Sequence, residues 1–295
     1  MNILYRMRRI LRRVRSYVLP WIPYIECERA VIGKGVVFGR GVLVRCDDLY
    51  IGDGCIIGDN VIIEASQFSI GDFGTIGRSC LFPGPGKIQI GHNFWLGRDC
   101  IVDSQGGTSI GNNVGIGAGS QLWTHMKYGS LLDGCRFHTT KPLNVSDNVW
   151  LVGHVLCSPV NIGPRSIIMF GSLVTKEIMA DTVVAGVPTQ DVTSKFGRPF
   201  DPLLPQERKE LLLDHINRAC EADHVLRENR SKFSLVQNES TREDWSDKVV
   251  INFETGTYIK RNTSLERRLI RKLLPDIKLL PSTLCVGSDQ SRNNL

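Results

Sequence analysis

Several features are scarce or absent in this sequence, and each absence limits what the protein can be. Its nine cysteines include no CxxC pair and are odd in number, so a reducing cytoplasm fits better than a disulfide framework or a zinc knuckle. No apolar run approaches the roughly 20 residues that cross a bilayer. Aromatic residues make up only 7% of the chain, against 29 glycines. Because glycine is retained where the backbone turns tightly, we expect many regular turns.

The rest of the composition is that of a soluble, folded chain. Its 295 residues, 42% of them hydrophobic and 22% charged, leave room for one large domain or two modest ones. The net charge of +6 is modest, but six arginines crowd between Arg6 and Arg15. This asymmetry predicts a local anionic partner and argues against nucleic-acid binding by the whole protein.

Residues 1–25 are predicted to contain a basic amphipathic helix. Aliphatic side chains recur there at helical spacing among the arginines, and Pro20 and Pro23 end the pattern. The arginines interrupt the apolar core that a cleaved signal peptide needs. Two interpretations stay open: residues 1–19 make peripheral contact with an anionic membrane, or the apolar stripe packs on its own domain or a neighbouring subunit.

From residue 32 onward a short pattern repeats, in which an aliphatic residue and a glycine precede two polar or small residues. The aliphatic residues that open successive coils, 19 or 20 residues apart, are Ile32, Ile51, Ile70, Ile90 and Ile110, and the pattern returns at Val145, Leu151, Ile162 and Ile168. Three strand-and-turn units return the chain to its starting face, and the coils must stack because one coil cannot bury its own face. The pattern therefore predicts a parallel β-helix. A β-sandwich would need longer alternating strands.

The predicted β-helix covers residues 26–195, and the composition changes after it. A helix is expected from Pro205, and the segments VVINF and TYIKR, joined by a glycine-containing turn, are typical of a hairpin. Residues 265–280 are basic and apolar. We expect residues 196–295 to form a mixed α/β extension, to which the sequence assigns no role.

The regular coil is broken once at length, by the loop 123–144, and this excursion is the candidate active-site loop. Its polar and aromatic residues are Trp123, Thr124, His125, Tyr128, Asp133 and His138. A histidine on such a loop can equally be an incidental surface residue. The neighbouring blocks of sequence favour the functional interpretation.

These blocks resemble the hexapeptide-repeat acyltransferases, in the branch of galactoside, maltose and xenobiotic acetyltransferases and polysaccharide O-acetyltransferases. The resemblance covers about residues 30–195. Its most specific blocks are Trp123-Thr124-His125, Asn148-Val149-Trp150, Gly171-Ser172-Leu173-Val174-Thr175-Lys176 and Ala185-Gly186-Val187-Pro188. The resemblance implies a mainly β fold, a left-handed parallel β-helix of hexapeptide repeats. It also implies a homotrimer, because the cofactor channel of this family lies between subunits.

The resemblance further implies roles for individual residues. His125 is expected to be the general base that deprotonates the acceptor, which then attacks the thioester directly, so that no cysteine is needed. The acceptor-binding residues implied are Asp103, Trp123 and Tyr128, and Asp103 either holds the acceptor or orients His125. The residues implied for acetyl-CoA, the co-substrate, are Trp150, Gly153, Gly171, Thr175 and Lys176. Lys176 offers a point charge for phosphate, whereas ordinary coil packing is the alternative for the others, above all Gly171.

The expected function is acetyl-CoA-dependent O-acetylation of a sugar hydroxyl in a surface polysaccharide or its lipid-linked precursor, with no metal. The sequence departs from galactoside acetyltransferases at Gly97 and Arg98, near which they carry an acceptor asparagine, and in the glycine after Trp150, which is displaced to Gly153. Three alternatives remain. They are N-acetylation of a nucleotide-linked amino sugar, a non-catalytic scaffold, and a γ-type carbonic anhydrase, for which His92, His125, His138 and His154 lack the ligand spacing.

Overall fold

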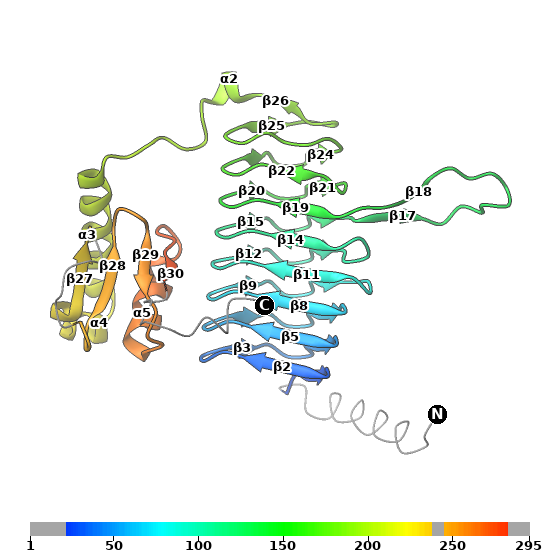
Figure 1. Ribbon diagram of the computed structural model, residues 1–295. Helices are drawn as coiled ribbons and strands as arrows, with labels where there is room; N and C mark the ends of the chain where they lie inside the picture. Colours follow the sequence, from blue (N-terminus) through cyan, green and yellow to red (C-terminus); the bar gives the residue numbers. More distant parts are fainter. Residues whose placement is uncertain (1–21, 238–244, 283–295) are drawn as a thin grey trace, which may run out of the picture. The chain divides into compact units, whose positions relative to one another are not determined.

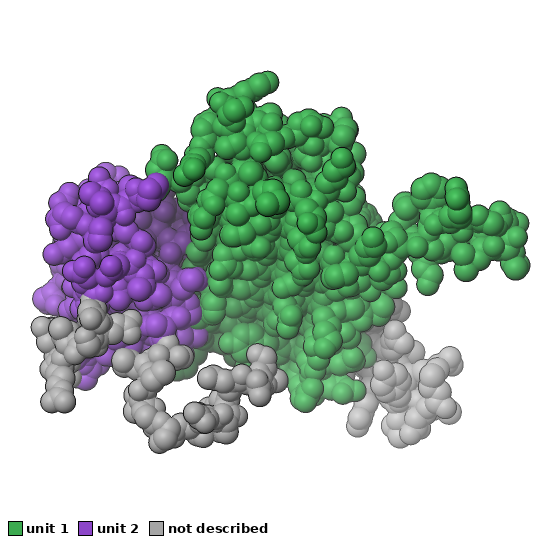
Figure 2. All heavy atoms as spheres, turned by 45° about the horizontal axis from the view of Figure 1, so that its top comes forward, with its two compact units in different colours: residues 1–201 green, residues 202–295 purple. Residues whose placement is uncertain are grey.

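The computed structural model describes residues 22–237 and 245–282 and divides the chain into two compact units, residues 1–201 and 202–295 (Figure 2). The amphipathic helix expected at the start of the chain lies outside the described residues. Only the end of the segment assigned to it is described, and there strand β1 begins at Tyr24. None of the described helices is long and apolar enough to cross a membrane.

Unit 1 is a left-handed parallel β-helix with three flat sheets, called here faces A, B and C, which the chain visits in that order in each coil (Figure 1). Face A contains β1 (Tyr24–Glu26), β4 (Leu43–Arg45), β7 (Ile62–Glu64), β10 (Leu81–Phe82), β13 (Ile101–Val102), β16 (Gln121–Leu122), β21 (Leu156–Cys157) and β24 (Leu173–Val174). Face B contains β2 (Arg29–Ile32), β5 (Asp48–Ile51), β8 (Gln67–Ile70), β11 (Lys87–Ile90), β14 (Thr108–Ile110), β19 (Leu143–Val145) and β22 (Asn161–Ile162). Face C contains β3 (Val37–Phe38), β6 (Ile56–Ile57), β9 (Thr75–Ile76), β12 (Trp95–Leu96), β15 (Gly115–Ile116), β20 (Trp150–Leu151), β23 (Ile167–Ile168), β25 (Val183–Ala185) and β26 (Gln190–Asp191).

The register of face B confirms the predicted repeat. The paired positions are Ile32 with Ile51, Ile51 with Ile70, Ile70 with Ile90, Ile90 with Ile110, and Ile110 with Val145. The side chains of Ile51 and Ile70 are fully buried. Ile32 is the exception, at 43% exposed, because its strand β2 is the outermost strand of face B.

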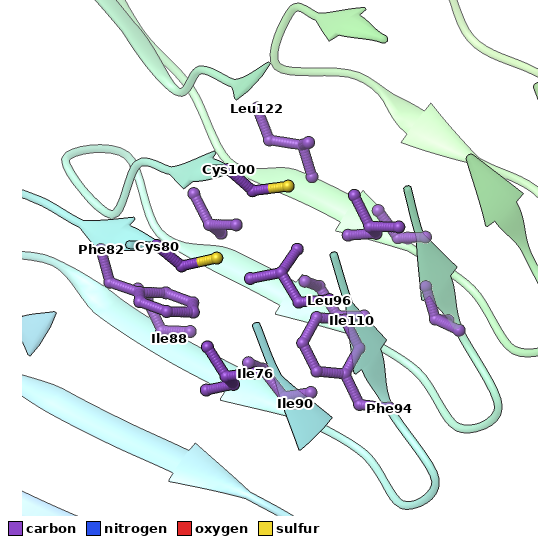
Figure 3. Close-up of a cluster of buried hydrophobic side chains, with 14 of the residues drawn as sticks. Ile76, Cys80, Phe82, Ile88, Ile90, Phe94, Leu96, Cys100, Ile110 and Leu122 are labelled. Carbon is purple, nitrogen blue, oxygen red and sulfur yellow. The ribbon is translucent and has the colours of Figure 1, made fainter. Parts of the chain in front are cut away.

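The interior is a column of stacked aliphatic and aromatic side chains (Figure 3). Phe82 is fully buried and meets Phe68 edge to face, with ring centroids 5.3 Å apart. Cys80 and Cys100 also point into this column (Figure 3). Burial of this kind supplies most of the stability of a stacked-coil protein, since each coil closes the apolar face of the next.

The turns explain why glycine and a polar residue follow each aliphatic residue. A Cβ atom on Gly52 would lie 2.6 Å from the backbone nitrogen of Asp72 in the next coil, so only glycine fits there. The carboxylate of Asp72 in turn accepts a hydrogen bond from the backbone N–H of Asp53 in the preceding coil, at 2.8 Å. The polar residue therefore satisfies a backbone donor that no strand partner reaches.

Three corners separate the faces, and two of them carry residues that the sequence predicted to be functional. The A–B corner joins each face-A strand to the next face-B strand, and the C–A corner joins each face-C strand to the next face-A strand. At the far end β26 turns back antiparallel to β25 and is followed by α2 (Thr193–Phe196).

Unit 2 is a small α/β unit. Its elements are α3 (Pro205–Ala222), α4 (His224–Glu228), the 3-10 helix η1 (Arg230–Lys232), β27 (Phe233–Val236), β28 (Val249–Asn252), β29 (Thr257–Ile259), α5 (Ser264–Leu273) and β30 (Leu280–Ser282). The predicted hairpin is confirmed, since β28 pairs antiparallel with β29. Two parallel strands, β27 and β30, flank it and were not predicted. The predicted helix from Pro205 is also present as α3.

Candidate active site

One long excursion leaves the β-helix at the A–B corner between β16 and β19. Strands β17 (His125–Lys127) and β18 (His138–Thr140) pair antiparallel there and form a ribbon, called here the arm, residues 125–140 (Figure 1). His125 stands at the base of the arm, paired with Thr140. Because the arm starts at a coil corner, its first residue lies against the coil below.

His125 meets Asp103 at this corner. Nδ1 of His125 lies 2.7 Å from Oδ2 of Asp103, which sits at the end of the coil below. The Asp103 side chain is 1% exposed and that of His125 is 32% exposed. The carboxylate is thus enclosed, while the histidine ring keeps an open side.

The other partners of Asp103 fix its ionisation. Oδ2 also accepts hydrogen bonds from the backbone N–H of Thr124, at 2.8 Å, and from the Thr124 hydroxyl, and Oδ1 accepts one from the backbone N–H of Gln105. Burial by itself raises the pKa of the Asp103 carboxyl, but the hydrogen bonds from Thr124, His125 and Gln105 outweigh burial and hold that pKa below its usual value. The ionised carboxylate only accepts, so Nδ1 of His125 carries a proton and Nε2 is the free acceptor.

Two further predicted residues lie on this loop. The indole Nε1 of Trp123 donates to Oε1 of Gln121 at 3.2 Å, and the Trp123 ring centroid lies 6.2 Å from that of His125, edge-on. Tyr128 lies further along the arm and is fully exposed. The structure therefore brings Asp103, Trp123 and His125 together in one chain, but not Tyr128.

The residues predicted for acetyl-CoA divide between two places. Thr175 and Lys176 follow β24 at the A–B corner, on the same side as His125, and both are exposed. Trp150 lies on face C, 48% exposed, and Gly153 and Gly171 lie at the C–A corner. Within one chain, these two groups do not form one site.

The two glycines differ in their surroundings. Gly153 is buried, and a Cβ atom there would lie 3.0 Å from the ring of Phe170. Gly171 is exposed with a φ of +69°, and a Cβ atom would meet nothing within 4 Å. The backbone angle alone accounts for glycine at position 171.

The buried thiol of Cys157 is poorly suited to nucleophilic attack. Burial raises the pKa of the Cys157 thiol to about 12, so it stays protonated. Within residues 22–237 and 245–282, no group of three His, Cys, Asp or Glu side chains is placed to hold a metal ion. His92 is occupied otherwise, since its Nδ1 accepts from the backbone N–H of Asp72 at 2.9 Å.

Sequence reasoning gave Thr124 no role, although it stands in the block that carries the resemblance. Its side chain is fully buried, and its hydroxyl bonds the Asp103 carboxylate. The only signal in the sequence was its place between two predicted site residues, Trp123 and His125.

Parts of the sequence are similar to known proteins. No family model matches the sequence. Galactoside O-acetyltransferase of Escherichia coli (strain K12) is 48% identical over 48 residues, which are 16% of this chain and 24% of that protein. A Staphylococcus aureus (strain MRSA252) protein, provisionally named an acetyltransferase, is 38% identical over 72 residues, 24% of this chain and 34% of its own. The chain thus spans only a quarter to a third of the length of these relatives.

Two solved structures are also similar. The polysialic-acid-specific acetyltransferase NeuO is 18% identical, with a TM-score of 0.36, and the match covers 58% of this chain and 84% of that one. The N-acyltransferase AntD from Bacillus cereus is 16% identical, with a TM-score of 0.38, covering 55% and 81%. TM-scores this low do not define a shared fold, so the fold assignment rests on the strand register itself.

The described chain is thus a β-helix of three-faced hexapeptide coils, with a histidine at the base of its long excursion, the arm. Over short stretches the sequence is similar to two acetyltransferases, and there the chain resembles the hexapeptide-repeat acetyltransferases.

Proposed function

We propose that this protein is an acetyl-CoA-dependent acyltransferase that O-acetylates a sugar hydroxyl of a surface polysaccharide or its lipid-linked precursor, at the cytoplasmic face of the membrane. The observation that carries the proposal is the contact of 2.7 Å between buried Asp103 and half-exposed His125. The identity with galactoside O-acetyltransferase supports a sugar hydroxyl as the acceptor. This sequence identity does not support a galactoside in particular as the acceptor.

The geometry supports His125 as the catalytic base. Asp103 holds Nδ1–H, which leaves the lone pair of Nε2 to act as the base on a ring that is 32% exposed. Nε2 takes the proton of the acceptor hydroxyl as its oxygen attacks the thioester carbonyl. When the C–S bond breaks, the same nitrogen returns the proton to the departing sulfur, which leaves the acetyl ester, the free thiol of CoA and a neutral histidine.

Asp103 is best assigned to orienting His125. Its carboxylate is 1% exposed and all its described contacts are with Thr124, His125 and Gln105. A buried carboxylate in this position stabilises the imidazolium that forms during the reaction. We therefore choose orientation over acceptor binding, the alternative that the sequence left open.

A shared site between neighbouring subunits would reunite the two groups of predicted acetyl-CoA residues. Thr175 and Lys176 of one subunit lie on the side of His125, and Trp150 on face C would come from the next subunit. We propose a homotrimer on this ground. In a ring of identical subunits, two different surfaces of each chain meet, so a site split between two surfaces is completed at every interface.

The outward side chains of the three faces support such a ring. On face C the outward column includes Val37, Ile56, Trp95 and Trp150, which are 37% to 56% exposed. On face A, Ile62 and Leu156 are 37% and 45% exposed. On face B the outward column starts with Val31 and Tyr50, which are 58% and 45% exposed, and is polar from the third coil onward: Ser69, Gln89, Ser109, Asn144 and Asn161. From the third coil onward, this contrast fits a chain whose face B meets solvent while faces A and C meet neighbouring subunits.

The proposal is tested with labelled acetyl-CoA and a panel of acceptors. The panel contains capsular and lipopolysaccharide-type glycans, their lipid-linked precursors and nucleotide-linked amino sugars. Base-labile label in a glycan, absent with His125→Ala, supports O-acetylation. Base-stable label in an amino sugar would establish N-acetylation instead. A protein that neither transfers the label nor binds CoA would be a non-catalytic scaffold.

A further inference from the structure

We infer that Thr124 is a positioning residue, which keeps Asp103 ionised and thereby holds the proton of His125 on Nδ1. One carboxylate oxygen, Oδ2 of Asp103, contacts three donors: the backbone N–H of Thr124, the Thr124 hydroxyl and Nδ1 of His125. Two of the three donors belong to Thr124. The role concerns the site of the proposed function, but the contacts themselves do not depend on the reaction.

The direction of these hydrogen bonds follows from which atoms can donate. The backbone N–H of Gly106 donates to Oγ1 of Thr124 at 2.9 Å, so that oxygen already accepts one bond. The backbone N–H of Thr124 donates to Oδ2, which makes Oδ2 the acceptor there. The hydroxyl hydrogen of Thr124 is thus directed to Oδ2, and a chain runs from Gly106 through Thr124 to Asp103.

Water cannot take the place of this hydroxyl. The Thr124 side chain is fully buried and that of Asp103 is 1% exposed. A carboxylate enclosed in this way keeps its charge only through the donors that the protein supplies. Removing one of three donors from Oδ2 therefore favours the protonated form of Asp103.

Charged groups at the same corner do not replace Thr124. Glu64 lies two coils below Asp103 along face A, and Lys176 and Glu177 follow β24, which lies two coils above β16. Lys141 gives its backbone N–H to the carbonyl of Thr124 at 3.0 Å, and its side chain is exposed. The side chains of Lys141, Lys176 and Glu177 are all exposed, so solvent screens their charges.

The chain offers a matched control for the loss of a buried hydroxyl. Thr108 is 3% exposed, and its hydroxyl donates to the backbone carbonyl of Asp103 at 2.7 Å. Thr108→Val thus removes a buried hydroxyl that bonds the backbone of Asp103, but it leaves the hydrogen bonds of the Asp103 carboxylate in place. Thr124→Ser keeps the donor that Thr124→Val removes.

The experiment titrates the Asp103 carboxyl by carbon-13 NMR in protein labelled at aspartate, with Asp103→Asn to assign the signal. The pKa of Asp103 should rise in Thr124→Val and stay near the wild-type value in Thr124→Ser and Thr108→Val. An unchanged pKa in Thr124→Val, or an equal rise in Thr108→Val, overturns the inference. If Thr124→Val does not fold, Thr124→Ala removes the same donor and is titrated under the same criterion.

Activity gives a second readout. Thr124→Val should lose at least about tenfold in kcat, the loss expected for a hydrogen bond to a charged group, with little change in KM for acetyl-CoA, and Thr124→Ser should recover most of it. Titration needs no turnover. A wild-type protein that acetylates nothing would therefore sink the proposed function and leave the inference about Thr124 to be decided by the NMR result.

Discussion

Nδ1 of His125 lies 2.7 Å from Oδ2 of Asp103, although the two residues are 22 positions apart in the sequence. The contact exists because Val102 pairs with Leu122, which places the ends of β13 and β16 in adjacent coils at the same corner. Asp103 is thereby directly below the point where the arm leaves the β-helix. In the proposed mechanism this pair supplies both the base and the group that orients it.

Loss of the base should abolish most of the activity. His125→Ala should lower kcat by at least about a hundredfold, because the proposed mechanism relies on His125 as its base. His92→Asn is a suitable control, since Asn112 occupies the equivalent position in the next coil and accepts the same kind of backbone bond, at 2.8 Å. Steady-state rates of both variants test this prediction, and near-normal turnover of His125→Ala would rule out the proposed mechanism.

The tautomer of His125 should depend on Asp103. Asp103→Asn replaces an acceptor by a group that also donates, so His125 loses the constraint that holds its proton on Nδ1, and kcat should fall by about 10²–10⁴. KM for acetyl-CoA should change little, since Asp103 is buried away from the open side of the ring. A large rise in KM for the acceptor at unchanged kcat would instead support acceptor binding.

The ionised Asp103 should also stabilise the fold in a pH-dependent way. Its folded-state pKa is below the ordinary 3.8, so its contribution is present above that pH and is lost as the pH falls through the lower folded-state value. The difference in unfolding free energy between the wild type and Asp103→Asn should therefore be constant near pH 6 and shrink below about pH 3.8. Urea unfolding of both proteins near pH 6 and below about pH 3.8 measures this difference in unfolding free energy. A difference of equal size at the lower pH would contradict an ionised Asp103 that stabilises the fold.

A shared active site can be tested by mixing two variants. His125→Ala and Trp150→Ala should each be weakly active at low acetyl-CoA, because each lacks one half of the proposed site. Trimers reassembled from equal amounts of both should recover about a quarter of the wild-type activity, since one in four interfaces then combines an intact His125 with an intact Trp150. Recovery no greater than the mean of the two separate variants would place both residues in independent sites.

The interior column should be sensitive to cavities. Phe82 is fully buried and packs edge to face on Phe68. Phe82→Ala should destabilise the protein by about 3–5 kcal/mol, and Phe82→Leu by less, because leucine leaves a smaller cavity. Chemical unfolding monitored by circular dichroism gives both values, and equal losses in the two variants would show that cavity size is not the cause.

Much of the fold was predictable from the spacing of single residues. Ile51, Ile70 and Ile90 recur at intervals of 19 and 20 residues, and these same residues pair in face B. A coil that must return to its starting face fixes the register by chain length alone, so a linear pattern was enough. The β28–β29 hairpin was predictable for the same reason, since its partners are adjacent in the chain. By contrast, β30 contains Pro281 and pairs with a strand about 20 residues earlier, so no local pattern indicated it.

The sequence by itself determined the coil, its period and the place where the coil is interrupted, because these depend only on which residues recur and how far apart. The tertiary structure decided which side chains meet: that Asp103 is buried against Thr124 and His125, and that Trp150 lies on a different face from Lys176. The physical reason is that a hydrogen bond requires two atoms within about 3 Å and correctly directed. Spacing along a chain fixes neither the distance nor the direction until the coils are stacked.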